Sequence, residues 1–516
     1  MSHGLSKSRL LALLQCERKL WLSAHRPDLE VTSAGVQGVF DTGHEVGEFA
    51  RRQESNRRGT GVLIDVRPHG WAEGVRRCVQ ALAAPGEQVL FEAPFVFGGD
   101  HGVGVLVDIV VKDEDGALTL IEVKSSTGLK GKPYLEDAAI QAWTMTQAGY
   151  PPDRVLLRLL DSQWVYAGDG NHDGLFVDLD VTADVLERFA SMAERVERGH
   201  AVLGAAEPPI EPGAHCTKPF ACGFARHCGD WDAARKPPPV AHPVHLLLRR
   251  NMGRFSRAEK RCLTDGTYLG LANLPPAFPA DERTRALVRS VLTHQAWVSA
   301  QLATMLAAVP YPRYHFDFET ISWAVPRWRA TRPYQQVSFQ WSCHVEHADG
   351  RVEHHEFLDL SGDDPREACA REIIDLMGRA DDGVVVVYAQ SFEQTRLREM
   401  ARDLPHHAAG LHRVMARLYD LLPVLRTHYY HPAQGSSWSI KQVLPTVAPE
   451  LDYASLVEVQ DGGSAQRAYL EAIAATEPAR KAQLRERMLA YCERDTEAML
   501  RLMRGLTSTT AMEEGH

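Results

Sequence analysis

Residues 103–124, VGVLVDIVVKDEDGALTLIEVK, decide the fold of the N-terminal half of this sequence. Two apolar runs, 103–111 and 117–123, flank the turn-forming residues DEDG (113–116) and predict a hairpin of two strands. Around this hairpin the hydrophobic periodicity predicts further elements: helices over 5–25, 36–52 and 134–148, and strands over 88–97 and 154–160. This order of helices and strands predicts an α/β core.

Polar residues interrupt the hairpin at three positions. Asp108 lies inside an apolar strand, where a carboxylate is costly unless a charged group binds it. Glu122 and Lys124 are two residues apart on the next strand and therefore share a face. Two carboxylates and a lysine at one place suit phosphodiester hydrolysis, in which the acids hold Mg²⁺ or Mn²⁺. The alternative is a strand with ordinary surface charges, in which Lys124 pairs with Glu122.

The surroundings of this set resemble the PD-(D/E)xK nuclease superfamily, and within it the RecB-like branch. DTGHEVGEFA (41–50) resembles the glycine–histidine helix of that branch, which implies that His44 is a metal ligand. DAAIQAW (137–143) resembles the helix whose glutamine supports the site, which implies that role for Gln141. The branch often has a tyrosine shortly after that glutamine, whereas this sequence continues AWTM.

Three of the nine cysteines are clustered. Cys216, Cys222 and Cys228 lie in HCTKPFACGFARHCGD, with spacing C-x5-C-x5-C, and Cys16 in the first helix is the candidate for a fourth ligand. In a reducing compartment such a group indicates metal binding, by an iron–sulfur cluster or by zinc, rather than disulfides. We expect the remaining cysteines to be small buried apolar residues: Cys78, Cys262, Cys343, Cys369 and Cys492.

One cysteine before a nuclease core and three after it resemble the iron–sulfur RecB-like nucleases, namely the CRISPR-adaptation nucleases and the AddB type. The resemblance implies that a [4Fe–4S] cluster holds the two ends of the domain together. The spacing here is wider than the commonest C-x2-C-x5-C form.

The C-terminal half contains a second set of acids. Asp317 and Glu319 share a strand face in HFDFET, and their neighbours should point into the core. Glu393 follows the apolar strand VVVVY, and Tyr491 and Asp495 are four apart on a helix. We expect the four carboxylates to hold two metal ions, with Tyr491 orienting the attacking water. Helix surfaces often carry acids without function. The prediction therefore rests on the order of these motifs along the chain together with their placement on strands and helices.

This second set resembles the tyrosine subtype of the DEDD exonuclease superfamily, which implies an RNase H-like fold. The second motif of that superfamily normally has aspartate, and here it is glutamate, Glu393. Lys441, in GSSWSIKQVLP, is either a phosphate contact or an ordinary solvated lysine. Across its whole length the sequence resembles a bacterial family that fuses an iron–sulfur RecB-like nuclease to a DEDD domain, with PYQQVSFQWS and SSWSIKQVLP typical of it.

The chain of 516 residues is long enough for two or three domains. The prolines of KPPPVAHP (236–243) mark a linker. We therefore predict a RecB-like domain over 1–235, a linker and helical connector over 236–309, a DEDD-type domain over 310–508 and a tail over 509–516. In the last domain strands are expected over 311–320, 336–345 and 384–388, and helices over 366–378 and 478–504.

Composition restricts the function further. No apolar run approaches the ~20 residues of a membrane span, so we expect a cytoplasmic protein with no membrane partner. The net charge of −10 disfavours a non-specific nucleic-acid coat but allows a nuclease whose acids bind metal. We expect a DNA exonuclease acting on single strands or ends at two sites. The alternatives are an RNA-directed C-terminal site and a binding adaptor with only one active site.

Overall fold

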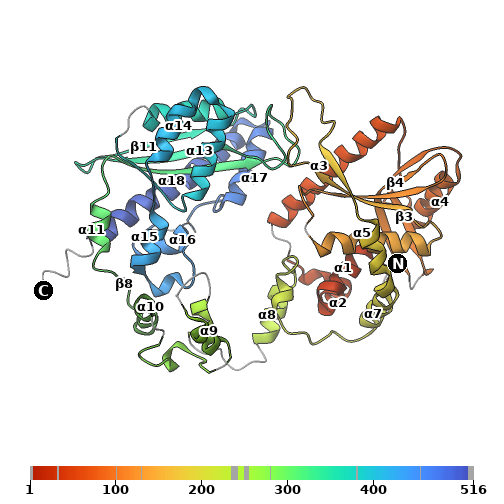
Figure 1. The fold of residues 1–516 in the computed structure, drawn as a ribbon, viewed down its shortest axis with the longest axis horizontal. Helices are drawn as coiled ribbons and strands as arrows, with labels where there is room; N and C mark the ends of the chain where they lie inside the picture. The colour runs from red at the N-terminus through yellow and green to blue at the C-terminus, as the bar shows by residue number, and fades with distance from the viewer. Residues whose placement is uncertain are drawn as a thin grey trace. The chain divides into compact units, whose positions relative to one another are not determined.

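The protein, described here from a computed structural model, is a mixed α/β chain that divides into two compact units (Figure 1). The first unit comprises Met1–Pro237 and Trp323–Gln335, and the second comprises Pro238–Ser322 and Gln336–His516. The structure describes residues 4–31, 34–99, 102–129, 131–233, 242–248, 255–265, 267–278, 281–378, 382–451, 453 and 455–508. Residues 236–241 of the predicted linker and the predicted tail over 509–516 lie outside the described residues.

The first unit is built on a seven-stranded sheet in the order β2-β3-β4-β5-β6-β7, with β1 beside β4. The predicted hairpin is confirmed, since β4 and β5 are antiparallel, and β6 then joins β5 in parallel. The strands are β1 (Leu5–Ser6), β2 (Val62–Leu63), β3 (Gln88–Phe97), β4 (Val103–Lys112), β5 (Leu118–Lys124), β6 (Arg154–Leu160) and β7 (Phe176–Asp180).

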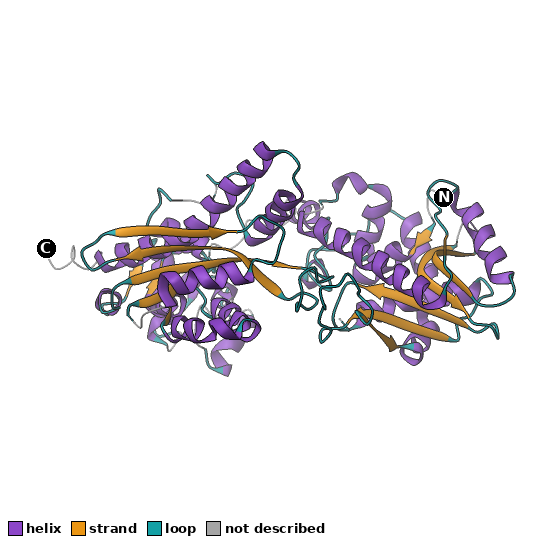
Figure 2. Ribbon diagram, turned by 90° about the horizontal axis from the view of Figure 1, so that it is seen from above, coloured by secondary structure: helices purple, strands orange, loops and turns teal. Residues whose placement is uncertain are grey.

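Helices cover both faces of this sheet (Figure 2). Val110 and Leu120 pack with Ala138 of α5 on one face, while Ile109 and Ile121 pack with Ala50 of α3 on the other. This alternation follows from the two-residue period of a strand. The helices are α1 (Lys7–Gln15), α2 (Glu17–His25), α3 (Ala34–Arg58), α4 (Gly70–Ala83), α5 (Lys132–Gln147), α6 (Thr182–Leu186), α7 (Met192–Gly204) and α8 (Ala225–Ala233).

The single helix predicted over 5–25 is wrong. The segment forms two helices, α1 and α2, because Cys16 between them is extended, with φ −168° and ψ 126°. The periodic leucines predict the helical turns correctly, but the sequence contains no proline or glycine that marks the break.

The second unit has a five-stranded sheet in the order β11-β10-β9-β12-β13. Strand β10 is antiparallel to β9 and β11, whereas β9, β12 and β13 are parallel. Its strands are β9 (Arg313–Ser322), β10 (Gln336–Glu346), β11 (Val352–Leu358), β12 (Val384–Val387) and β13 (Leu418–Asp420), and a two-stranded sheet pairs β8 (Trp297–Val298) with β14 (Tyr429–Tyr430).

The two faces of the five-stranded sheet have different helices. Phe316 and Phe318 are buried against α12 (Arg366–Ile373), α13 (Ser391–Asp403) and α14 (Ala408–Ala416), as predicted for the neighbours of the acids. The opposite face is covered by α17 (Gly462–Ala474) and α18 (Pro478–Ser508) (Figure 1). The other helices of this unit are α9 (Arg257–Thr264), α10 (Glu282–Thr293), α11 (Leu302–Ala307), α15 (Leu421–His428) and α16 (Ile440–Val443).

The connection between β9 and β10 belongs to the first unit, although we predicted one continuous domain over 310–508. In the first unit Ala324 and Val325 pack with Val46 and Leu160, and the hydroxyl of Tyr334 donates to the carbonyl of Ser125 at 2.7 Å. The apolar side chains of this connection are therefore buried in the first unit, whereas the strands β9 and β10 that it joins belong to the second unit. No described helix is long and apolar enough to cross a membrane.

Candidate active sites and a four-thiol pocket

The first acidic set lies on the face of the first sheet that α5 covers. Glu122 of β5 accepts hydrogen bonds from Lys124 Nζ and Gln141 Nε2, each at 2.7 Å, so the structure brings these three predicted residues together. Asp108 of β4 accepts the backbone N–H of Val123 at 2.8 Å. All three predicted polar side chains of the hairpin therefore meet at one place.

The carboxyls of this site carry opposite pKa shifts. Burial, followed by the charge of Glu122, raises the pKa of Asp108 to about 8. Burial alone would also raise the pKa of Glu122, but Lys124 and Lys7 outweigh it and hold the pKa of Glu122 below its usual range. A site in which one buried acid keeps its proton at neutral pH has room for one more positive charge.

Two residues of this site were missed from the sequence. Lys7 of α1 donates to Glu122 Oε1 at 3.0 Å and lies 3.2 Å from Asp137 Oδ1. Asp137 of α5 also accepts from Lys124, and it accepts from Gln141 Nε2 at 3.1 Å. The only signal for Asp137 was its position four residues before Gln141, on the same helix face, and Lys7 offered no signal.

His44 is exposed on α3, the helix that packs on the opposite face of the sheet. Among the described residues, the groups of potential ligand atoms that lie within 4.8 Å of one another do not include His44. Its role as a ligand stays a prediction.

The second acidic set lies between β9 and α18. Asp317, Glu319 and Asp495 each offer a carboxylate oxygen, and these atoms lie within 4.8 Å of one another. Burial, followed by Asp495, raises the pKa of Asp317 well above its usual range and that of Glu319 to about 8. Like charges held this close in a buried site need a cation or protons, which is the behaviour expected of divalent-metal ligands.

Glu393 reaches the same place from the first turn of α13. It is 2% exposed, and its Oε2 has no hydrogen-bond partner within the described chain. Burial raises its pKa to about 7, and its carboxyl interacts directly with that of Asp317. An orphaned buried oxygen beside Asp317 suits a fourth ligand. Among the described residues, the group of ligand atoms within 4.8 Å of one another comprises Asp317, Glu319 and Asp495, and Glu393 joins it through its contact with Asp317 alone.

The turn that carries Glu393 is fixed by Asp420. Its two carboxylate oxygens accept the backbone N–H groups of Ala389 and Gln390, each at 3.0 Å. Ala389 has a positive φ of 72°, which the turn between β12 and α13 requires. Asp420 is therefore a brace for the turn.

Tyr491 and two further side chains complete the second set. Lys441 Nζ lies 3.1 Å from the hydroxyl of Tyr491 and also donates to the carbonyl of Gln460, so it is not an ordinary solvated lysine. Tyr453 donates to Asp495 Oδ1 at 2.5 Å. Sequence reasoning missed Tyr453 because it lies in an irregular stretch, LDYASLV, with no periodicity.

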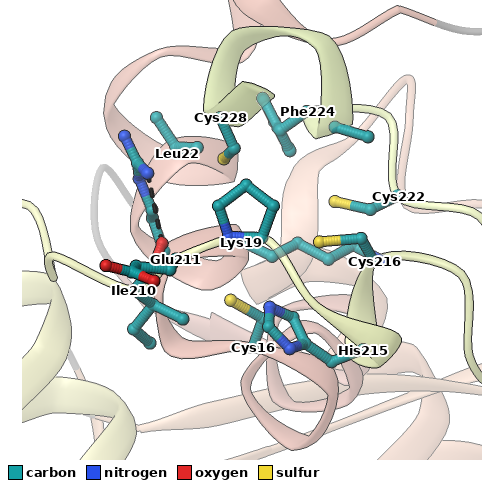
Figure 3. A pocket seen from close by; sticks show the side chains of 13 residues that line it. Cys16, Lys19, Leu22, Ile210, Glu211, His215, Cys216, Cys222, Phe224 and Cys228 are labelled. Atoms are coloured by element: carbon teal, nitrogen blue, oxygen red, sulfur yellow. Dashed lines mark hydrogen bonds between the residues drawn. The ribbon is translucent and has the colours of Figure 1, made fainter. Parts of the chain in front are cut away.

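The four predicted cysteines line one pocket between α2 and the segment that leads into α8 (Figure 3). Burial raises the pKa of Cys228 against the opposing charge of Arg18, and Cys222, Cys16 and Cys216 add to the increase, so the thiols are neighbours. The sulfur of Cys216 also accepts the backbone N–H of Gly213 at 3.4 Å. The sequence thus identified a set of thiols that the fold brings together across 200 residues.

The spacing of the sulfurs bears on the kind of metal. Within the described residues, the ligand groups whose atoms all lie within 4.8 Å include no three of these cysteines. A single tetrahedral Zn²⁺ holds its sulfurs about 3.8 Å apart, since each Zn–S bond is about 2.3 Å.

The remaining cysteines are buried as expected except Cys262, which is half-exposed because α9 buries only Leu263.

Fold and sites together define a two-unit, mixed α/β protein with two buried acidic sites and a thiol pocket. Residues 314–439 match a family model described as a domain of unknown function (DUF2779), which spans less than half of the chain. The comparison with curated proteins gives no match. A solved structure named "Crystal structure of SSO0001" is similar, with 12% identity and a TM-score of 0.24, over 44% of this chain and 86% of that one.

Proposed function

We propose that the protein is a metal-dependent nuclease that hydrolyses phosphodiester bonds of DNA, acting on single strands or ends. The observation that carries the proposal is the meeting of Asp317, Glu319 and Asp495 within 4.8 Å, with Glu393 beside Asp317. Without cations this surface would repel phosphate. The donor set fits Mg²⁺ or Mn²⁺, because these ions prefer carboxylate oxygens.

In the second unit the side chains have distinct roles. The four carboxylates would hold divalent ions, which would supply the positive charge for water activation and for the leaving oxygen. Tyr491 orients the attacking water through its hydroxyl, and Lys441 fixes that hydroxyl from 3.1 Å away. The strand order β11-β10-β9-β12-β13, with β10 antiparallel, supports an RNase H-like, DEDD-type assignment.

In the first unit Asp108 and Glu122 are the proposed ion ligands of a RecB-like PD-(D/E)xK site. Lys124, held between Glu122 and Asp137, offsets charge that develops on the phosphate. Gln141 orients Glu122. Lys7 Nζ lies 3.0 Å from Glu122 Oε1 and would compete with a divalent ion for that carboxylate.

The thiol pocket is the proposed site of a [4Fe–4S] cluster. Cys16 at the start of α2 and the three cysteines of 216–228 line one pocket (Figure 3), and four cysteine thiolates are the usual ligands of such a cluster. Tying segments 200 residues apart restricts the unfolded chain, which stabilises the first unit.

The test is a nuclease assay on full-length protein purified without oxygen. Single- and double-stranded DNA and RNA, labelled at one end, are incubated with Mg²⁺ or Mn²⁺ and wild type, Asp108→Ala, Asp317→Ala or the double variant. We expect each single variant to lose a different part of the product pattern and the double variant to be inactive.

Two exposed turn residues provide matched controls, Asp115→Ala for the first unit and Asp349→Ala for the second. Both should digest like wild type. A double variant with wild-type activity would refute the proposal. Faster digestion of RNA than DNA by Asp108→Ala would assign the second site to RNA.

A further inference from the structure

Two histidines and a glutamate meet beside the second sheet on three different elements. His344 of β10 and His354 of β11 are direct cross-strand partners, so their rings share one face, and Glu493 comes from α18. One ligand atom from each of the three lies within 4.8 Å of the others. None of them belongs to the acidic site.

Each imidazole is already oriented by a hydroxyl. His344 Nδ1 lies 2.8 Å from Thr496 Oγ1, and His354 Nε2 lies 2.9 Å from Ser342 Oγ. The two hydroxyls are themselves 2.9 Å apart. Metal-binding histidines usually use one ring nitrogen for such an oxygen partner and the other for the metal. The arrangement leaves the opposite nitrogen of each ring for a further ligand.

The carboxylate of Glu493 lies beside His354 without a hydrogen bond to it. Its Oε1 is 3.7 Å from His354 Nδ1, too long for a hydrogen bond. A second group, Glu367 with His406 and His407, shows the contrast, because there the carboxylate accepts directly at 2.7 and 3.1 Å. The carboxylate of the second group therefore bonds its imidazoles directly, whereas in the first group 3.7 Å separates His354 Nδ1 from Glu493 Oε1.

We propose that His344, His354 and Glu493 bind one Zn²⁺ ion, which ties β10 and β11 to α18. Two imidazoles and a carboxylate are a typical three-ligand set for zinc, with water in the fourth position. Mg²⁺ and Mn²⁺ prefer oxygen ligands, so this site and the acidic site select different ions. Glu493 lies between Tyr491 and Asp495 on α18, and the ion therefore anchors the helix that carries them.

The test counts zinc in the full-length protein. Wild type and variants are treated with chelator, dialysed against micromolar Zn²⁺ and analysed for zinc and iron. We expect His354→Ala to bind one zinc fewer per chain than wild type, and Glu493→Gln to bind that zinc at least tenfold more weakly. Zinc bound elsewhere, including at the thiols, is the same in wild type and variant, so it cancels when the two zinc counts are subtracted.

His355→Ala is the matched control, because His355 is the next residue of β11 and contacts Glu353 instead. It should keep the wild-type count, as should Asp317→Ala. Equal counts in wild type and His354→Ala would overturn the proposal. If His354→Ala does not fold, Glu493→Gln decides, and wild-type affinity in that variant overturns it. The readout is independent of nuclease activity.

Discussion

Asp317 and Glu393 approach the same point from a strand and from a helix, and each carboxyl affects the pKa of the other. Glu393 occupies the position at which the second motif of the DEDD superfamily, which this sequence resembles, has aspartate. Its side chain, longer by one methylene, still reaches Asp317. Asp420, which also acts on the pKa of Glu393, accepts the backbone N–H groups of Ala389, Gln390 and Leu422. The contacts of each acid therefore distinguish the proposed metal ligands from Asp420, which holds the turn.

Glu393→Gln should lower kcat of the second site about 100-fold, nearly as much as Asp317→Ala. Loss of one charge weakens ion binding and misplaces the attacking water. Tyr491→Phe should be milder, at about 1–3 kcal/mol of barrier, because only an orienting hydroxyl is lost. The measurement is release of nucleotides from an end-labelled strand in an Asp108→Ala background. Wild-type rates for Glu393→Gln would exclude it as a ligand.

Lys7→Met should lower the Mn²⁺ concentration that gives half-maximal activity at the first site by several-fold. The substitution removes an ammonium group 3.0 Å from Glu122 that competes with the metal ion for that carboxylate. Titration of Mn²⁺ in an Asp317→Ala background measures the effect. Lys132→Met, which removes an exposed charge from the start of α5, is the control and should leave the requirement unchanged.

Among the secondary-structure elements, the break between helices α1 and α2 could not be predicted from the sequence. Their apolar periodicity is continuous across LLALLQCERKLWL, yet the chain is extended at Cys16. Local propensity favours an unbroken helix, and only the packing against 210–228 accounts for the thiol's position in the pocket (Figure 3). The predicted strands over 88–97 and 154–160, by contrast, have the observed bounds, and each is paired with a neighbouring strand on both sides.

Cys222→Ala should lower the melting temperature of the first unit and reduce the iron content below about four per chain, because the proposed cluster would lose a ligand. Calorimetry and iron analysis of brown protein purified without oxygen measure both effects. Cys262→Ala, a half-exposed thiol outside the pocket, should match wild type. A colourless wild-type protein with stoichiometric zinc would replace the cluster by a zinc site.

For the whole molecule, the buried acids link stability to pH. The pKa values of Asp108, Glu319 and Glu393 are raised to about 8, 8 and 7, so these three carboxyls bind more protons in the folded chain than in the unfolded one between about pH 4 and 8. The lowered pKa values of the buried His315 and His344 act in the opposite sense below about pH 6.5. The metal-free protein should therefore lose stability, on the order of a few kcal/mol, as the pH rises from 5 to 8. The lowered pKa of Glu122 contributes stability that is lost only below this window.

Thermal unfolding between pH 5 and 8, with chelator and with Mn²⁺, measures this dependence. Mn²⁺ should flatten the profile because bound cations replace the protons. Asp108→Asn should flatten the metal-free profile of the first unit, and Asp115→Asn, at an exposed turn, should not. A metal-free protein that becomes more stable from pH 5 to 8 would contradict the assignment of protons to these carboxyls.

The sequence by itself determined the features that depend on local periodicity. Alternation along strands placed Asp317 and Glu319 on one face, and the four-residue spacing of a helix did the same for Tyr491 and Asp495. The tertiary structure alone decided that Lys7 contacts Glu122, that Tyr453 contacts Asp495, and that residues 323–335 pack in the first unit. Such contacts join residues far apart in the chain, so they depend on how elements pack and leave no periodic trace in the sequence.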